Sequence, residues 1–435
     1  MWFDESVIYQ IYPLGYVGAP EINDGVTEHR ILKIIDHFPH FKKLNINTIY
    51  FCPIFESSKH GYDTKDFAKI DCRLGNNDDF KKVCDELHKN SIKVIIDGVF
   101  NHVGREFFAF KDVQENKYNS SYKDWFYINF DGNSSYNDGF YYEGWEGHFE
   151  LVKLNLDNPS VKDYLFNSIK NWISEFGIDG LRLDVAYMLN KNFMRELRQV
   201  TNSIRDDFFL VGEMIHGDYN SIVNNEMLHS ATNYECYKGI YSSFNEMNMF
   251  EISYSLNRQF GSENWCLYTG KNMVSFIDNH DVNRIASALT NKNHLNLAFG
   301  LLFTMPGIPC IYYGSEWGEL GEKSNGSDTP LRPHIESPKF NELSEFISKL
   351  CKIRIDSKVL AYGNLTNLHV TNHQYVFERR LDDRRIIVMI NASENDYQLN
   401  FNFNAESGLN LITNEKISLN SPLVLPPCSI QIIEC

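Results

Sequence analysis

The sequence predicts an α/β protein: a (β/α)₈ TIM barrel with a small inserted domain after the third barrel strand and a C-terminal antiparallel β-sandwich domain. Three observations predict this fold: a series of short apolar runs, most of them followed by amphipathic segments; a long interruption after the third run; and a change of texture near the C-terminal end. The length of 435 residues suits a barrel with a lesser domain attached. We place the barrel at 1–102 and 157–355, the inserted domain at 103–156 and the sandwich at 356–435.

The apolar runs are the expected barrel strands. They are Val7–Tyr12, Thr48–Pro53, Lys93–Phe100, Gly180–Val185, Phe208–Glu213, Ala231–Tyr234, Met273–Asp278 and Ile308–Tyr313. Their near-continuous apolar character is typical of parallel strands buried on both faces. An open doubly wound sheet is the alternative, and the lack of a glycine-rich phosphate loop after the first run disfavours it.

Helices are expected between these runs. The candidates are Ile31–Lys43, Asp78–Lys89, Val161–Phe176 and Phe193–Asp206. In Val161–Phe176 the apolar residues recur at the i, i+3, i+4 spacing of one helix face.

Two stretches depart from this alternation. The segment 103–156 is rich in Tyr, Phe, Asn, Asp, Gly and Ser, shows little helical periodicity and is too long for an ordinary loop between a strand and a helix. It predicts a small domain over the barrel mouth. From residue 356 onwards, alternating runs at Gln374–Arg379, Arg385–Ile390 and Ser429–Ile433 indicate antiparallel strands.

The composition limits the kinds of partner and the cellular compartment that the protein is expected to have. The net charge of −16 disfavours nucleic acid and is indifferent to a neutral substrate. Nine scattered cysteines without a CxxC pair argue against a disulfide framework and a structural zinc site, and favour a reducing compartment. The N-terminus lacks a signal-peptide pattern, and no apolar run reaches the length of about 18 residues that a membrane span needs. We therefore predict a cytoplasmic protein with no membrane partner, as a monomer or homodimer.

Polar residues gather where the expected strands end, which is where a barrel builds its active site. One such residue alone could be a helix cap. Several on one rim indicate a functional cleft. They are Asp97 and His102 at the end of the third run, Arg182 and Asp184 on the fourth, Glu213 on the fifth, and Asn279, His280 and Asp281 after the seventh.

Two carboxylates in unequal environments suit glycoside hydrolysis, with one ionised as a nucleophile and one protonated as an acid. Arg182 and Asp184 share a face of their strand, so the arginine is expected to lower the pKa of Asp184 and keep it ionised. Glu213 has no neighbouring cation in the sequence and is the expected group with a raised pKa.

These motifs, in this order, resemble the α-amylase superfamily of glycoside hydrolases (glycoside hydrolase family 13) over about the first 350 residues. The resemblance implies a retaining mechanism, with Asp184 as the nucleophile, Glu213 as the acid/base and Asp281 as the stabiliser of the transition state. It also implies a set of substrate-binding residues: Tyr62, His102, Arg182, His280, Asp328 and Arg332.

The usual amylase calcium site is not intact in this chain. Asn101 matches one of its ligands, but Met188 stands where a histidine is frequent and Lys153 lies where an aspartate is expected. Methionine is a poor ligand for a hard cation, and lysine repels one. Our hypothesis is that Lys153, in a segment that resembles cyclomaltodextrinases and neopullulanases, replaces the calcium charge and ties the inserted domain down. We predict no required cofactor and no metal ligand, and calcium elsewhere, as at Asp131–Asp138, stays open.

The predicted function is hydrolysis of α-1,4-glucosidic bonds in starch-derived glucans or maltodextrins, as in an α-amylase. The alternatives are a cyclomaltodextrinase or neopullulanase and an α-1,6-glucosidase, with which Val185 after the nucleophile is compatible. Transglycosylation stays open. A catalytically inactive sugar-binding homologue would lack Asp184, Glu213 or Asp281, and all three are present. Three aromatic residues are candidate platforms for sugar rings: Tyr142, Trp145 and Tyr187.

Overall fold

The structure, a computed structural model, describes residues 1–324 and 326–435. Eight parallel strands lie side by side in the order β13-β12-β11-β5-β2-β1-β15-β14. A parallel bridge between Thr232, just after β13, and Val274 of β14 joins the two ends of the sheet, so the strands close into a barrel. The strands are β1 (Ile8–Ile11), β2 (Thr48–Phe51), β5 (Lys93–Gly98), β11 (Gly180–Leu183), β12 (Phe209–Gly212), β13 (Ser230–Ala231), β14 (Val274–Phe276) and β15 (Ile308–Tyr312). The predicted barrel is confirmed.

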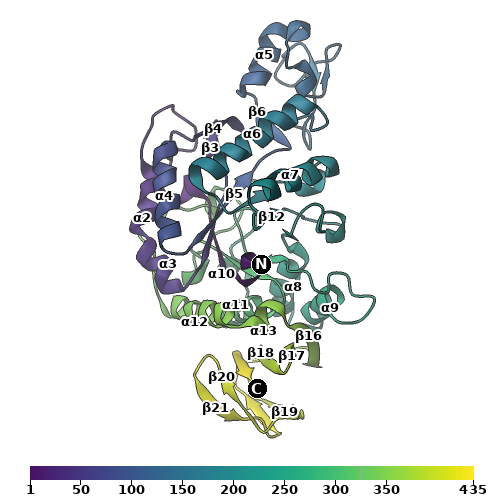
Figure 1. The fold of residues 1–435 in the computed structure, drawn as a ribbon. Helices are drawn as coiled ribbons and strands as arrows, with labels where there is room; N and C mark the ends of the chain where they lie inside the picture. The colour runs from purple at the N-terminus through teal and green to yellow at the C-terminus, as the bar shows by residue number, and fades with distance from the viewer. Residues whose placement is uncertain (325) are drawn as a thin grey trace.

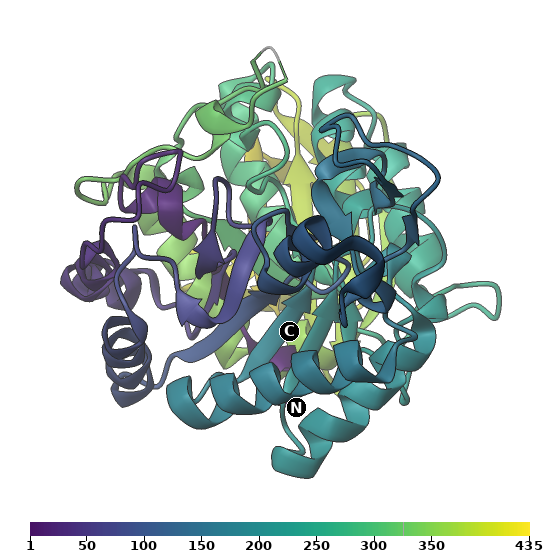
Figure 2. The same ribbon diagram turned by 90° about the horizontal axis from the view of Figure 1, so that it is seen from above.

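Helices surround the barrel (Figures 1 and 2). They are α1 (Pro13–Tyr16), α2 (Lys33–Asp36), α3 (Phe38–Leu44), α4 (Asn77–Lys89), α6 (Pro159–Phe176), α7 (Lys191–Ile204), α8 (Tyr234–Asn245), α9 (Met249–Phe260), α10 (Ile285–Ala288), α11 (Leu295–Thr304), α12 (Glu342–Asp356) and α13 (Lys358–Tyr362). The helix expected at Ile31–Lys43 is split, because Pro39 takes a first-turn position of α3, where its missing N–H is tolerated. None of the helices in the described ranges has the length and apolar character of a membrane-crossing segment.

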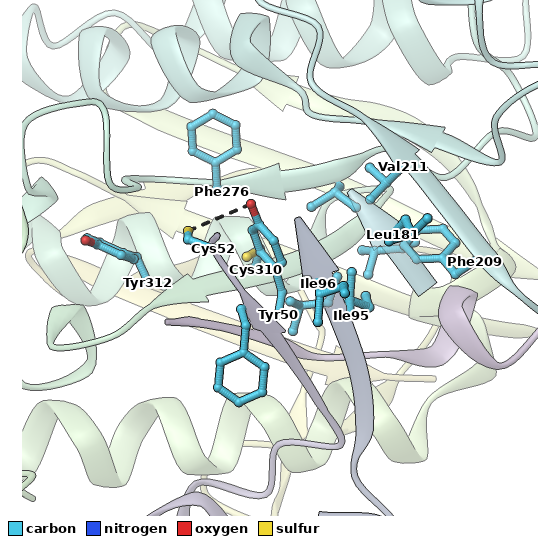
Figure 3. Packing of buried hydrophobic residues seen from close by; sticks show 14 of the residues in the cluster. Tyr50, Cys52, Ile95, Ile96, Leu181, Phe209, Val211, Phe276, Cys310 and Tyr312 are labelled. Atoms are coloured by element: carbon cyan, nitrogen blue, oxygen red, sulfur yellow. Dashed lines mark hydrogen bonds between the residues drawn. The ribbon is translucent and has the colours of Figure 1, made fainter. Parts of the chain in front are cut away.

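The inside of the barrel is filled by large side chains (Figure 3). Tyr50, Ile95, Val211, Phe276 and Cys310 are all at most 7% exposed. This packed layer supports the residues at the carboxyl ends of the strands, so the barrel is a rigid floor rather than a pore.

The segment between β5 and α6 stands over the barrel, in dark blue in Figure 2. Its strands are β6 (His102–Gly104), β7 (Ile128–Asn129), β8 (Tyr141–Tyr142), β9 (Gly144–Trp145) and β10 (His148–Lys153). They form a three-stranded antiparallel sheet, β6-β10-β9, and an antiparallel pair, β7-β8. It also contains the helix α5 (Phe108–Asn116), which the sequence does not predict. This helix buries Ala109, Phe110 and Val113, a short pattern that the surrounding aromatic residues obscure.

The remaining strand pair of the barrel loops is β3 (Phe55–Ser57) with β4 (Thr64–Ile70). The C-terminal part forms a six-stranded antiparallel sheet, ordered β16-β17-β18-β23-β20-β21, and a two-stranded sheet of β19 and β22. Its strands are β16 (Asn364–Val370), β17 (Gln374–Leu381), β18 (Arg384–Asn391), β19 (Tyr397–Leu399), β20 (Ser407–Asn410), β21 (Glu415–Ser418), β22 (Leu423–Leu425) and β23 (Ser429–Glu434). One apolar cluster, including Val376, Met389, Leu399 and Leu425, joins the two sheets, and the predicted antiparallel architecture is confirmed.

Candidate active site

A cleft of about 1050 Å³ opens at the carboxyl ends of the barrel strands. Most of the predicted site residues line it: Tyr62, His102, Asp184, Glu213, Asp281, Asp328 and Arg332. Arg182 and His280 lie in the layer below, where both line a cavity of about 30 Å³ inside the barrel. The structure therefore brings all nine predicted residues to one place, in two layers.

Arg182 joins the carboxylates at the floor of this cleft. Its Nη1 lies 2.8 Å from Asp97 Oδ1 and 2.9 Å from Asp184 Oδ1, and its Nη2 lies 2.9 Å from Glu213 Oε1. The strand register explains the arrangement, because Arg182 of β11 pairs with Asp97 of β5 on one side, while β12, which ends just before Glu213, runs along the other. One planar guanidinium thus orients acids from three adjacent strands.

The expected lowering of the Asp184 pKa is wrong. Burial raises the pKa of Asp184 well above its usual range; Arg182 lowers it, and the charges of Glu213 and Asp97 raise it further. The expectation fails because burial outweighs Arg182, and because Arg182 is not reserved for Asp184 but also contacts Glu213.

The two carboxylates differ instead in their other contacts. Glu213 Oε2 accepts a hydrogen bond of 2.9 Å from the backbone N–H of Val185. That residue has φ 41° and ψ 46°, a left-handed conformation that is strained for a β-branched side chain. Asp184 Oδ2 faces His102 Nε2 at 3.9 Å. Burial lowers the pKa of His102 to about 3, so this histidine presents a neutral imidazole.

A second network surrounds Asp281. Its Oδ2 lies 2.9 Å from His280 Nε2, and its Oδ1 lies 2.9 Å from Arg332 Nη2. Arg332 also contacts Asp328 Oδ2 at 3.2 Å, and the hydroxyl of Tyr62 lies 2.5 Å from His280 Nε2. Burial lowers the pKa of His280, but Asp281 and Cys52 together more than offset burial and raise the pKa to about 10. Burial likewise raises the pKa of Asp281, but His280 and Arg332 more than offset it, so this carboxylate is held ionised with its pKa below the usual range.

Several contributing residues are absent from the predicted site. Asp97 accepts hydrogen bonds from the hydroxyls of Tyr50 at 2.9 Å and Tyr62 at 3.2 Å, and Tyr234 donates to Glu213 Oε1 at 3.4 Å. Asp97 is one of the polar residues at the strand ends, and Tyr234 ends the sixth apolar run, so position on the rim could have found both. Tyr50 lies inside an apolar run and gives no signal of its own.

The three aromatic candidates for sugar contact lie in different environments. Trp145 lines the cleft, with its ring 6.0 Å from that of His102. Tyr142 is fully buried in the inserted segment, and its hydroxyl donates to the carbonyl of Phe149, so it is a packing residue. Tyr187 donates a hydrogen bond of 3.3 Å to Glu146, at the tip of the hairpin that carries Trp145.

The residues near the expected calcium site are engaged with one another. Lys153 Nζ lies 3.0 Å from Glu143 Oε2, and both residues belong to the inserted segment. This ion pair fastens strands of that segment to each other. In the stretch Asp131–Asp138, Asp138 is bound by Arg105 at 2.8 Å and by Ser134 at 2.6 Å, as in an ordinary polar turn.

One group of metal-capable side chains lies elsewhere among the described residues, at Glu56, Asp71 and Cys72. Its two carboxylates already have cationic partners, because Arg73 binds Asp71 at 2.7 Å and Lys65 lies 3.4 Å from Glu56. This group is therefore accounted for by ion pairs within the chain.

Comparison with known proteins agrees with this geometry. Residues 10–358 match the model of the α-amylase catalytic domain, and residues 367–434 match that of the cyclomaltodextrinase C-terminal domain. The maltogenic α-amylase of Bacillus acidopullulyticus is 31% identical, over 97% of this chain and 75% of that protein. Neopullulanase 2 of Thermoactinomyces vulgaris is 32% identical, over 90% of this chain and 70% of that protein. A solved cyclomaltodextrinase structure superposes with a TM-score of 0.87 at 27% identity, over 99% of this chain and 78% of that one.

Proposed function

Because the chain belongs to the α-amylase family of glycoside hydrolases, we propose that it hydrolyses α-1,4-glucosidic bonds in cyclomaltodextrins and short maltodextrins with retention of configuration. The observation that carries the proposal is the pair of carboxylates, Asp184 and Glu213, held by one guanidinium at the floor of one cleft. The names of the relatives and the C-terminal match support the substrate class. This order reverses the one that the sequence predicts, in which starch comes first.

The proposed reaction has two steps. Asp184 attacks the anomeric carbon while Glu213 gives its proton to the departing glycosidic oxygen, so one C–O bond forms and one breaks. Glu213 then removes a proton from water, and the resulting hydroxide displaces Asp184 from the sugar. Each step inverts the anomeric carbon once, and the configuration is retained overall.

Glu213 must carry a proton when the substrate binds. In the free protein Oε1 pairs with Arg182 Nη2 at 2.9 Å, and Oε2 accepts a hydrogen bond from the N–H of Val185. A proton on either oxygen therefore weakens the contact of that oxygen with its donor. Asp184, whose pKa burial raises, must lose any proton it holds, and positive charge developing on the sugar favours that loss.

The residues around Asp281 fit a role in gripping the sugar. Asp281, Arg332 and His280 present charged donors and acceptors at the cleft, and charged partners make the strongest hydrogen bonds. We propose that they bind the hydroxyls of the sugar being cleaved, with Tyr62 stacking on its ring and His102 donating beside Asp184.

Product analysis on four substrates tests the proposal. Cyclodextrin, starch, pullulan and isomaltose are incubated side by side with the protein and with Asp184→Asn. We expect cyclodextrin to be opened and degraded fastest, with no product from the variant. Internal cleavage of starch with cyclodextrin untouched would return the assignment to an α-amylase, and preference for isomaltose would assign an α-1,6-glucosidase. Product from Asp184→Asn at the unaltered rate would remove Asp184 from the mechanism.

We also propose a cytoplasmic location. All nine cysteines are free in the structure, which suits a reducing compartment. Cell fractionation with an antibody to the protein tests this, and recovery outside the cytoplasm would contradict it.

A further inference from the structure

The imidazole of His280 is enclosed by neighbouring side chains. Its ring lies nearly parallel to those of Tyr12 and Tyr62, with centroids 6.2 and 5.7 Å away and interplanar angles of 12° and 8°. At the Nε2 edge it meets Asp281 Oδ2 at 2.9 Å. The side chain is only 2% exposed, so the ring has a single orientation.

Gln10 closes the opposite edge. It points into the barrel from β1 and is 4% exposed. Its terminal amide nitrogen lies 2.8 Å from His280 Nδ1 and 3.2 Å from the sulfur of Cys52, which Figure 3 shows beside Tyr50 in the barrel. The reaction proposed above uses neither Gln10 nor Cys52.

The contacts of His280 indicate which of its two ring nitrogens carry a hydrogen. The hydroxyl of Tyr62 donates to Asp97, so its oxygen, 2.5 Å from Nε2, accepts there and Nε2 carries a hydrogen. The carboxylate of Asp281, 2.9 Å from Nε2, can only accept and favours the same assignment. A neutral ring would then leave Nδ1 as an acceptor, matched by the amide nitrogen of Gln10. A charged ring carries a second hydrogen on Nδ1 and needs an acceptor there. A half-turn of the Gln10 amide supplies its oxygen without moving any other heavy atom.

We propose that Gln10 is a positioning residue for His280: its amide oxygen accepts the Nδ1 hydrogen and holds the ring as a cation against Asp281. In this arrangement the thiol of Cys52, on the other side of the same amide atom, also donates to that oxygen. Gln10 thereby keeps Nε2–H directed at the hydroxyl of Tyr62, beside Asp281.

The groups packed against His280 favour the charged ring. They are Asp281 after β14, Asp97 on β5, Tyr62 before β4, Cys52 after β2, Tyr12 after β1, and Arg332 through its contact with the backbone oxygen of His280. Burial lowers the pKa of His280, but Asp281 and Cys52 together outweigh burial and raise the pKa to about 10. A ring that is charged at neutral pH requires an acceptor at Nδ1, and Gln10 is the group within reach.

Two substitutions test whether Gln10 acts as a hydrogen-bond acceptor or as a donor toward His280 Nδ1. Gln10→Met keeps the length of the side chain and removes both polar atoms, whereas Gln10→Glu keeps the acceptor and removes the donor. A hydrogen bond to a charged group contributes enough to move the titration of His280 by about one to two pH units. Gln10→Asn, which withdraws the amide by one methylene group, serves where Gln10→Met folds poorly.

The readout is kcat/KM of each variant divided by that of the wild type, from pH 6 to pH 10, on a chromogenic maltooligosaccharide. The ratio cancels every titration that the substitution leaves unchanged. For Gln10→Met and Gln10→Asn we expect it to fall by about a further tenfold at the alkaline end, and for Gln10→Glu to stay level. Ile11→Val, which trims the next residue on the opposite face of β1, should give a level ratio near one.

A direct titration accompanies the kinetics. Histidine labelled with ¹³C at Cε1 reports His280 by NMR, assigned by the signal lost in His280→Gln. We expect His280 to titrate at lower pH in Gln10→Met than in the wild type or Gln10→Glu. An unchanged titration in Gln10→Met, or equal losses in Gln10→Met and Gln10→Glu, would overturn the inference. The kinetic arm rests on the proposed function; a wild type inactive on every glucan would refute that function, while the NMR titration still tests Gln10.

Discussion

Replacing Arg182 by lysine is the sharpest test of how the site is held together. The guanidinium contacts Asp97 and Asp184 through Nη1 and Glu213 through Nη2, at 2.8–2.9 Å. A lysine keeps the positive charge but concentrates it at one nitrogen. The lysine can therefore contact the carboxylates on one side of the cluster, and the contacts on the other side are lost.

The size of the effect follows from the hydrogen bonds that a lysine cannot make. At least one charge-assisted hydrogen bond disappears, and such a bond contributes about 1.5–3 kcal/mol. If it acts fully in the transition state, kcat/KM falls by about 10- to 150-fold. Arg182 also lowers the pKa of Asp184, against the effect of burial. A weaker cation lets that pKa rise, so the acid limb of the kcat/KM profile should move to higher pH.

The assay is kcat/KM on cyclodextrin across pH 4 to pH 9 for Arg182→Lys and a matched control. Arg195→Lys makes the same chemical change on α7, where the side chain is 40% exposed and pairs with Glu226 at 3.0 Å. Exposed pairs contribute little, so the control should match the wild type. If Arg182→Lys kept more than about a third of the wild-type kcat/KM and its acid limb did not move, a guanidinium shared between the two carboxylates would be refuted as the basis of the site.

Three further predictions concern stability, metal and substrate contact. Burial places the folded-state pKa of Asp184 above its unfolded value, so the protein loses stability as pH rises through the folded pKa and this group ionises. Asp184→Asn removes that loss and should raise the free energy of unfolding by about 0.5–2 kcal/mol at pH 7, with no gain near pH 3. Guanidinium titrations measure both values. Lys153→Met removes the partly exposed pair with Glu143 and should cost less than about 1 kcal/mol by the same method, while EDTA should leave wild-type hydrolysis unchanged. Trp145→Ala should raise KM for cyclodextrin by about 2- to 10-fold with a smaller effect on kcat, measured by initial rates.

The fold was largely readable from the sequence because parallel barrel strands are buried on both faces. That burial requires continuous apolar runs, and each of the eight expected runs overlaps an observed strand. Prediction was weaker where a local signal competes with composition. Pro39 divides one expected helix into α2 and α3, and α5 lies hidden among aromatic and polar residues of the inserted segment.

The sequence predicted which residues form the site, but it did not predict their pKa values. The acids and histidines at the strand ends could be recognised because charged residues are rarely fully buried unless they are paired. Neighbours in the sequence gave the wrong direction for the pKa of Asp184, because burial outweighs Arg182, and because this cation is equally near to Glu213 in space. Gln10 gave no signal, since a single polar residue in a buried strand becomes informative only when its partner is known to be His280.

The end of β11 shows why these groups work as a unit. Arg182 points into the barrel and reaches acids on both neighbouring strands, Asp184 extends into the cleft, and the strained backbone of Val185 turns its N–H toward Glu213. Each contact crosses from one strand to the next, so each depends on the barrel register. A shift of β11 by one residue would send Arg182 to the outer face and remove the links to both acids together. The closed barrel therefore does more than support the cleft: its register sets which carboxylates share a charge.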